Sequence, residues 1–471
     1  RSLNPIKFPK FEVTEEERLP LLKSDPDSLE KNIKDFLGTQ SKTYRKSFEQ
    51  DPTLFQNYST IYVPKQFLVP DVILKRIALQ DSLIAAILQV RGAQISQFGR
   101  PLKNRFSNGY RICIKPQFER TLSTEQRNDI LVKIEKATKT MFTCGDVEGV
   151  EPEKQMTFSQ YLRLIVQDGL LFGRFATEFV YKKNLAGEKF FSYFRPTDAG
   201  TIYFATPSNQ EAAKELREHA RKLLADINKT AKRQIDYDRF INGEYKFIQV
   251  INGKPQQAFF GDELVVHNLF PSTNVDLLGY PSTPIDRAIS DVMTHINITT
   301  YNKMYFQSGR ASKGMLVVQS SVIDNDTLND LRHHFNASIN NAQNAWRMPV
   351  IGINPDDNVE WKPIDNSSRD MEYQYLYDTN IRIILSEFQM SPEEIPGYGY
   401  LSRGTTSQAL SESNNAYQLE AARDSGIRPL LLEIQDFINH RILPVLAPDI
   451  AEICYLSLEG LDKDAPEKEV S

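Results

Sequence analysis

Apolar residues recur at helical spacing in three long stretches of the first half of the chain. The stretch Val69–Gln97 predicts a long helix, and its apolar positions are Ile73, Ile77, Leu79, Leu83, Ile84 and Leu88. Ser123 begins a second helix that reaches Phe142, because Gln126 three residues later completes a capping box. A third helix is predicted over Phe158–Phe172, and Gly173 ends it.

Alternation of apolar and polar residues predicts short strands between these helices. The strands are expected at Tyr110–Lys115, Phe175–Tyr181, Glu188–Phe194, Tyr245–Ile251 and Gln257–Phe260. Residues 1–60 are polar and carry early prolines, which is typical of a loosely attached arm. Asn209–Lys232 predicts a very polar helix, and its interleaved acidic residues favour a solvated outer helix over a nucleic-acid-binding one.

A long amphipathic helix is predicted after the apolar run Leu264–Val266 and His267. Ser282 or Thr283 is its cap, Pro284 fits its first turn, and it can run to about Gln307. About 24 residues at roughly 1.5 Å each give a rod of about 36 Å. One face is apolar, with Ile285, Ala288, Ile289, Val292 and Ile296. The opposite face is expected to carry Asp286, Asp291, His295 and Lys303.

A small α+β unit is predicted next, followed by a second long helix over Arg369–Phe388. The unit consists of a strand, a helix and two further strands, expected at Met315–Gln319, Asp326–Asn341, Met348–Ile353 and Val359–Lys362. Because the unit lies between two long helices, these helices must run side by side for its ends to meet.

The segment Met390–Thr406 combines prolines and glycines with tyrosines, which predicts an apolar loop. A third helix over Ser407–Ala422 and a fourth over Ile427–Leu443 are expected after it. Pro429 is placed in the first turn of the fourth helix, Pro444 follows that helix, and the tail from Leu461 is charged. The mixture of helices and strands predicts the α+β class, and 471 residues suggest two to four domain-sized units.

Composition narrows the function classes. The net charge of −5 argues against a protein that holds nucleic acid on a basic surface, but not against one that lets DNA slide past. Cys113, Cys144 and Cys454 lack the spacing of a zinc site or disulfide framework. No apolar run is long enough to span a membrane, and no signal peptide is visible. Because the chain begins at Arg1 rather than Met, we expect that an N-terminal piece is missing or removed.

Enzymatic signatures are absent from the sequence: it has no phosphate loop, no GxGxxG, no HExxH and no GxSxG motif. His333 and His334 point about 100° apart on a helix and form a poor metal site. Asp324, Asp326 and Asp330 lack the glycine and glutamate of a calcium loop, so capping explains them better. We therefore expect no enzymatic activity, no metal and no cofactor.

Several motifs occur in an order that resembles the portal family of tailed bacteriophages in its siphophage-like form. They are Leu170–Ala176, Phe194–Pro196, Leu264–His267 with Leu278–Pro284, Phe306–Val318, and Arg369–Met390 followed by Ser391–Ile395. Each motif is weakly specific, but their order and gaps over Phe158–Leu446 are strongly so. Two departures are Gln389-Met-Ser, where the family has a proline, and the charged helix over 209–232, which resembles an insertion.

The resemblance implies an α+β portal fold with a wing, two stem helices, an inserted clip and a tunnel loop. By this mapping the parts are a 1–60 arm, a 61–280 wing, a 281–309 stem helix, a 310–367 clip, a 368–390 second stem helix, a 391–406 tunnel loop, 407–446 wing helices, and 447–471 as the start of a crown or a mobile tail. The loop residues expected to meet DNA are Gly397, Tyr398, Gly399, Tyr400, Leu401, Arg403 and Gly404. Lys303 and Arg310 are candidates for lining the channel, and stem packing is assigned to Ile285, Ile289, Val292 and Ile296.

The resemblance also implies partners and a place. Copies of the chain, usually twelve, form a closed ring at one capsid vertex through which double-stranded DNA is packaged and ejected. Further partners are the terminase large subunit, the head–tail adaptor, the major capsid protein and a scaffolding protein, with no membrane. The location is the virion and, during assembly, the host cytoplasm.

Three alternatives stay open. The chain could form another head–tail connector ring without a DNA-translocating role. A DNA-processing enzyme of the packaging machine is a second rival, which would need a phosphate loop and clustered carboxylates. Within the loop, Tyr398, Tyr400 and Leu401 could pack on the adjacent helix rather than face the channel.

Overall fold

The structure is a computed structural model, and it describes residues 61–65, 68–103, 107–146, 155–183, 188–205, 221–222, 224–229, 233–251, 253–307, 314–319, 358–363, 370–398 and 420–461. The chain divides into two compact units. The smaller contains residues 296–365 together with 1–46, and the larger contains residues 47–295 and 366–471. The boundary lies inside one long helix, between His295 and Ile296.

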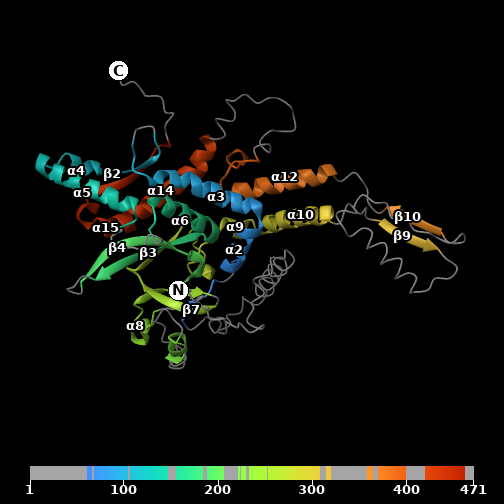
Figure 1. Ribbon diagram of the computed structural model, residues 1–471, viewed down its shortest axis with the longest axis horizontal. Helices are drawn as coiled ribbons and strands as arrows, with labels where there is room; N and C mark the ends of the chain where they lie inside the picture. The colour runs from blue at the N-terminus through green and yellow to red at the C-terminus, as the bar shows by residue number, and fades with distance from the viewer. Residues whose placement is uncertain are drawn as a thin grey trace, which may run out of the picture. The chain divides into compact units, whose positions relative to one another are not determined.

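The elements of the larger unit up to residue 295 include both helices and antiparallel strands (Figure 1). In chain order they are β1 Tyr62–Val63, α2 Asp71–Gln80, α3 Ser82–Ser96, η4 Gln97–Gly99, β2 Gly109–Ile114, α4 Pro116–Glu119, α5 Thr124–Phe142, α6 Phe158–Phe172, β3 Arg174–Lys183, β4 Lys189–Thr197, η6 Ala199–Thr201, β5 Ile202–Ala205, α8 Tyr237–Ile241, β6 Tyr245–Ile251, β7 Lys254–Phe260, β8 Leu264–Asn268, η7 Val275–Leu277, α9 Pro284–Arg287 and the first turns of α10 Ile289–Gln307.

The remaining elements of the larger unit follow residue 366. They are α12 Asp370–Glu387, η9 Pro392–Glu394, η11 Arg423–Ile427, α14 Arg428–Phe437, η12 Ile438–Ile442, α15 Leu443–Leu446, α16 Pro448–Ala451 and β11 Cys454–Glu459. This mixture of helices and strands confirms the predicted α+β class.

The core of the larger unit forms around α6, which packs along α3 and against β3 (Figure 1). Both α5 and α6 begin with a capping box, and Gly173 ends α6 in a left-handed conformation with φ of 74°, as predicted. Strand β3 lies between β4 and β8, and all three run antiparallel. A second antiparallel sheet has the order β1-β5-β6-β7.

The helical structure predicted over Val69–Gln97 is confirmed, and Asp81 divides it into two helices, α2 and α3. The backbone of Asp81 is extended, and its carboxylate accepts hydrogen bonds from the amides of Leu83 and Ile84 at the start of α3. The apolar periodicity therefore restarts at residue 82. Leu79, one of the apolar positions of the predicted pattern, is 87% exposed.

A break between the third and fourth helices was predicted at residues 423–426, and this prediction is wrong. The backbone is helical from Glu420 to Leu446 without a break. Pro429 and Pro444 each follow a π-turn, η11 or η12, instead of starting or following a helix. A proline removes one donor and crowds the preceding turn of an α-helix. The wider π-turn accommodates this locally, so the helix continues.

One further prediction differs at a described position. Leu224 belongs to the segment expected to be a solvated helix, yet it is buried in the core beside the β1-β5-β6-β7 sheet. Residues 454–459 form β11, which pairs antiparallel with β2, so the described start of the 447–471 segment is a strand; its assignment to a crown stays a prediction. Cys113, Cys144 and Cys454 are free thiols.

In the smaller unit, the described residues are the last turns of α10 and two strands, β9 Gly314–Gln319 and β10 Asn358–Pro363. The strands pair antiparallel, with Gly314 opposite Pro363 and Gln319 opposite Asn358. The strands predicted at Met315–Gln319 and Val359–Lys362 are thus confirmed. The helix expected at Asp326–Asn341 and the strand at Met348–Ile353 lie outside the described residues.

Candidate functional site

The segment leading into the first long helix is fixed by side-chain bonds to the body. Thr283 is the cap, and it forms a capping box with Asp286. The Asp286 carboxylate also accepts a hydrogen bond of 2.9 Å from the amide of Val69. Earlier in the chain, on β8, His267 Nε2 lies 2.8 Å from a carboxylate oxygen of Glu433. The first contact ties α9 to the residues before α2, and the second ties β8 to α14.

The predicted apolar face of this helix is buried, with one exception. Ile285 and Val292 are fully buried and Ile296 is 5% exposed, whereas Ile289 is only partly buried. The helix is not one continuous rod, because Ala288, with φ of −95° and ψ of 19°, separates α9 from α10. Whether this face also packs against another copy of the chain stays a prediction.

His295 was predicted on the polar face, and that assignment is wrong. The residue is 1% exposed, and its Nδ1 lies 2.9 Å from a carboxylate oxygen of Asp81, which is itself buried. Its ring stacks on Tyr377 of α12, with centroids 5.5 Å apart. Helical spacing carried the correct signal, since residue 295 lies three positions after buried Val292.

An ion pair that the sequence did not reveal joins α3 to the start of the predicted tunnel loop. The Arg91 and Glu394 side chains are 2% and 4% exposed, and their closest charged atoms are 2.8 Å apart. Arg91 Nη2 also donates to the Gln389 carbonyl at 2.6 Å, and Gln94 donates to Glu394 at 3.0 Å. Burial lowers the pKa of the Arg91 guanidinium, and the Glu394 carboxylate opposes that shift. The sequence did contain a signal for a buried charge, because Arg91 is the only charged residue between Ser82 and Ser96.

The loop begins where α12 ends, after a turn at residues 388–389. Gln389 stands near the point where the family pattern has a proline, and its φ of 53° is rare for a residue with a side chain. Tyr398 is half-buried. Burial raises its pKa, while side-chain hydrogen bonds with Ser82 and Tyr377 lower it. In this structure the Tyr398 side chain therefore lies on neighbouring helices.

The other predicted site residues are only partly within the described chain. Gly397 is exposed, with φ of 95°, and Lys303 is exposed on α10. The positions outside the described residues are Arg310, Gly399, Tyr400, Leu401, Arg403 and Gly404. The structure thus brings together the start of the loop, α3 and α12.

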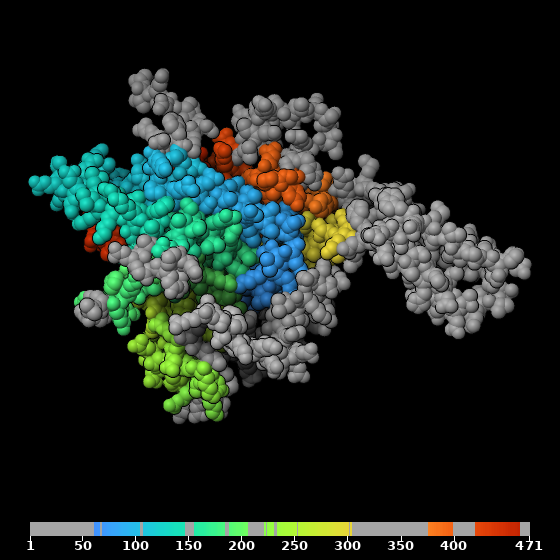
Figure 2. Space-filling view, viewed as in Figure 1, coloured from blue at the N-terminus to red at the C-terminus, as the bar shows by residue number. Residues whose placement is uncertain are grey.

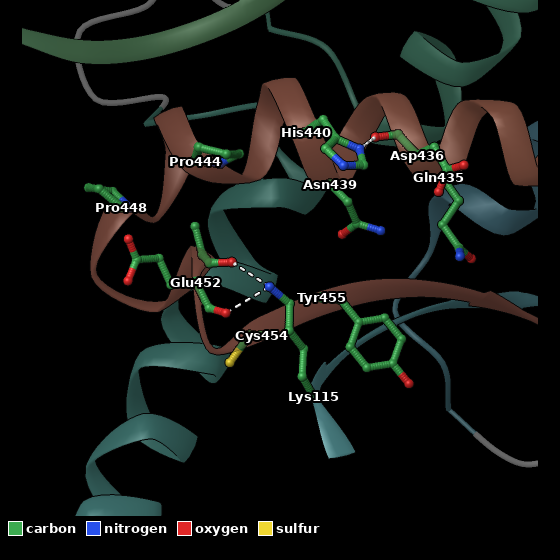
Figure 3. A pocket seen from close by; sticks show the side chains of 11 residues that line it. Lys115, Gln435, Asp436, Asn439, His440, Pro444, Pro448, Glu452, Cys454 and Tyr455 are labelled. Carbon is green, nitrogen blue, oxygen red and sulfur yellow. Dashed lines mark hydrogen bonds between the residues drawn. The ribbon is translucent and has the colours of Figure 1, made fainter. Parts of the chain in front are cut away.

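A pocket of about 660 Å³ lies between β2, η12, α16 and β11 (Figure 3). Lys115 donates to the carbonyl oxygens of Glu452 and Ala451, at 2.7 and 3.4 Å, and His440 bonds the Asp436 carbonyl at 2.7 Å. These bonds link backbone segments and do not form a nucleophile–base pair. Among the described residues no group of histidine, cysteine and acidic side chains could hold a metal, and no helix is long and apolar enough to cross a membrane.

Comparison with known proteins identifies related chains. The family model described as "Phage portal protein" matches residues 147–459. A "Probable portal protein" of Staphylococcus phage Twort is 22% identical over 367 residues, covering 77% of this chain and 57% of that protein. A protein of the same description from Enterococcus phage phiEF24C is 23% identical over 367 residues, covering 77% and 56%. The chain therefore spans little more than half the length of these relatives.

Solved structures give more distant matches. A chain from the neck of an empty gene transfer agent particle is 12% identical, with a TM-score of 0.47 and coverage of 88% of this chain and 89% of that one. The crystal structure of a HK97 family phage portal protein from Corynebacterium diphtheriae is 9% identical, with a TM-score of 0.43 and coverage of 82% and 94%. The assignment rests on the family model, which spans well over half of the 471 residues. On that ground the chain belongs to the phage portal protein family.

Proposed function

We propose that the chain is one subunit of a ring at a capsid vertex and that this ring is the channel for double-stranded DNA during packaging and ejection. The observation that carries the proposal is the match to the portal family over residues 147–459. Within that range lie α10, the β9–β10 pair and α12, in the order expected for stem, clip and stem.

A closed ring needs two different surfaces on each subunit, because each copy contacts one neighbour on each side. Helix α12 offers apolar side chains for such a contact: Tyr375, Leu376 and Ile383 are 75%, 51% and 41% exposed. Exposed apolar side chains on one helix are typical of a surface that another protein covers. They support ring formation through the second stem helix.

The charge of the chain also fits a channel. A protein that moves DNA of any sequence must avoid tight phosphate binding, which needs many clustered cations. The chain has a net charge of −5, and Lys303 is a single exposed cation on α10. We propose that Lys303, Arg310 and Arg403 make only transient phosphate contacts.

The proposed partners follow from the same role. The ring, expected to have twelve copies, would serve as the docking platform for the terminase motor and later for the head–tail adaptor, within a shell of major capsid and scaffolding protein. The protein itself would be structural, without ATPase or nuclease activity, in the virion and, during assembly, in the host cytoplasm.

Electron microscopy of the purified protein tests the assembly, and genome packaging tests the channel. We expect closed rings with a central hole, and we expect deletion of residues 397–404 to leave those rings intact while impairing packaging or retention of DNA. Normal packaging by the deletion variant would favour the alternative, a connector ring without a DNA-translocating role. Failure of the variant to form rings would show that the loop is a packing element.

A further inference from the structure

Two segments that are separated by more than thirty residues meet at the Arg91 side chain. The first is the stretch after α12, where Arg91 bonds the Gln389 carbonyl and the Glu394 carboxylate. The second is Gly426, in the π-turn η11. A Cβ built on Gly426 would lie 2.4 Å from Arg91 Nη2 and 2.4 Å from the Gln389 carbonyl oxygen. The backbone at Gln389 and the backbone at Gly426 therefore pack on the same guanidinium group.

Glycine is required at position 426 because a side chain would not fit there. The backbone conformation does not require it. Gly426 lies in helical backbone and has no positive φ. Real Cβ atoms do not approach other atoms to 2.4 Å, so any other residue would force Arg91 or Gln389 away. The requirement for glycine at residue 426 thus comes from the close approach of Arg91 and Gln389, and a turn does not explain it.

The cluster has the properties of a device that fixes geometry. A buried arginine–glutamate pair contributes little net stability compared with an apolar replacement, because both charges lose their hydration. Its hydrogen bonds are strong and directional, and the flat guanidinium offers several donors in fixed directions. Arg91 uses these donors on the Glu394 carboxylate, the Gln94 amide oxygen and the Gln389 carbonyl at once.

We propose that Arg91 is a positioning residue for the tunnel loop: it holds residues 389–394 and Gly426 together, and so sets where the chain leaves the stem and where it returns. The proposal rests on the proposed function, because it takes the residues between these points to include the loop that meets DNA. In the surface view the blue segment that contains α3 adjoins the orange segment that contains α12 (Figure 2).

Gly426→Ala is the sharpest test, because it separates the two segments without changing any charge. Alanine favours a helix more than glycine does, so a loosened structure could not be attributed to helix propensity. The matched control is Gly261→Ala, whose Cβ would lie at an ordinary 3.4 Å from Lys246 Cγ, at a position without positive φ. A second variant, Arg91→Met with Glu394→Met, replaces both charges by apolar groups of similar length.

Hydrogen exchange on assembled rings without DNA gives the first readout. Overpacking costs of about 1–3 kcal/mol correspond to an increase in exchange of roughly fivefold to 150-fold, which we expect at residues 389–398 and 423–427 in Gly426→Ala and not in Gly261→Ala. Unchanged exchange at these residues in Gly426→Ala would overturn the proposal whatever the protein does with DNA.

Packaging by the same rings gives the second readout. We expect Gly426→Ala and the double-Met variant to form rings, and the double-Met variant to keep nearly normal thermal stability, while both retain a smaller fraction of full-length genomes. If the double-Met variant packages normally, Arg91 is merely structural and the proposal fails. If the exchange changes occur but the 397–404 deletion packages normally, the positioning is real and the channel role of the loop is what fails.

Discussion

Two regions are held together in different ways. We call the residues packed around α6 the body, and the place where α3 meets α10, α12 and the start of the predicted loop the junction. In the body, Phe158, Tyr161, Phe194 and Tyr110 contact one another, mostly ring edge to ring face, with centroids 4.9–6.5 Å apart. In the junction, buried apolar side chains such as Ile84 and Ile384 are accompanied by two buried polar bonds, Arg91–Glu394 and His295–Asp81. Apolar burial stabilises in proportion to area and has little direction, whereas hydrogen bonds fix distances and angles.

This difference matches what each region must do. The body needs only to remain folded, and a cluster of large rings is sufficient for that. The junction must hold α3, α10, α12 and the start of the predicted loop at defined positions, and directional bonds achieve this. We therefore expect body variants to change stability broadly and junction variants to change the local positions of helices and loop.

The largest expected effect is in the body. Phe158→Ala removes a fully buried ring and should lower the free energy of unfolding by about 3–5 kcal/mol. Phe190, in the adjoining strand β4, is 45% exposed, so Phe190→Ala should cost less than about 1 kcal/mol. Denaturant titration followed by circular dichroism measures both. Equal losses would contradict the view that apolar packing around α6 dominates the stability of the body.

The next effect tests the junction. Asp81→Ala removes the cap of α3 and leaves His295 buried without its carboxylate, so we expect a loss of about 3 kcal/mol. Asp236 is a matched control, because it also caps a helix with two amide bonds, at α8, but is exposed and has no buried histidine. Asp236→Ala should cost about 1 kcal/mol. Similar losses in both variants would mean that the Asp81–His295 bond adds nothing to the junction.

Much of the body could be predicted from the sequence, because its signals are local. Ser123 with Gln126 marked the start of α5, and Gly173 marked the end of α6. Thr283 and Pro284 likewise marked the start of the first long helix. Each of these signals lies within a few residues of the boundary that it determines, so a pattern search finds it.

The junction could not be predicted, because its partners are distant in the sequence. Arg91 and Glu394 are 303 positions apart, and Asp81 and His295 are 214 apart. Polar residues such as Asp81 and His295 are usually assigned to the surface, and only the helical phase of His295 relative to Val292 indicated burial. The π-turn before Pro429 was missed for a related reason. In a sequence a proline indicates the first turn of a helix, and only the structure shows that the wider turn η11 accommodates Pro429 within a continuing helix.

Asp168 is an exception within the body, the single carboxylate on helix α6. Burial raises its pKa to about 7, against an ordinary value of 3.8, although the Ala199 amide donates a hydrogen bond to it. Because the folded-state pKa is raised, its contribution to stability is fully present below about pH 4 and is lost as pH rises through about 7.

Asp168→Asn should therefore be more stable than the parent protein at pH 8, by roughly 1–2 kcal/mol, and similar to it at pH 4. The expected gain is below the full shift because the side chain keeps some contact with solvent. Glu135 on α5 is a control, since Lys139 holds it in an exposed ion pair, and Glu135→Gln should not be stabilising at either pH. Thermal denaturation at the two pH values measures the difference. A gain at pH 8 that persists at pH 4 would exclude titration of Asp168 as its cause.

The smallest effect concerns Tyr398, where the predicted loop meets the junction. Tyr398→Phe removes only the hydroxyl that interacts with Ser82 and Tyr377, so a loss of about 0.5–1.5 kcal/mol is expected locally. The Tyr398 amide bonds the Ile395 carbonyl at 3.1 Å, and its hydrogen exchange should accelerate by a few-fold up to roughly tenfold. Tyr455→Phe, at a partly buried position of β11, is the control and should leave exchange at residue 398 unchanged. If Tyr398→Phe alters genome retention but not exchange in empty rings, the hydroxyl acts on DNA and not on the helices. If exchange changes and retention does not, Tyr398 is a packing residue, and any contact with DNA must come from Tyr400, Leu401 or Arg403.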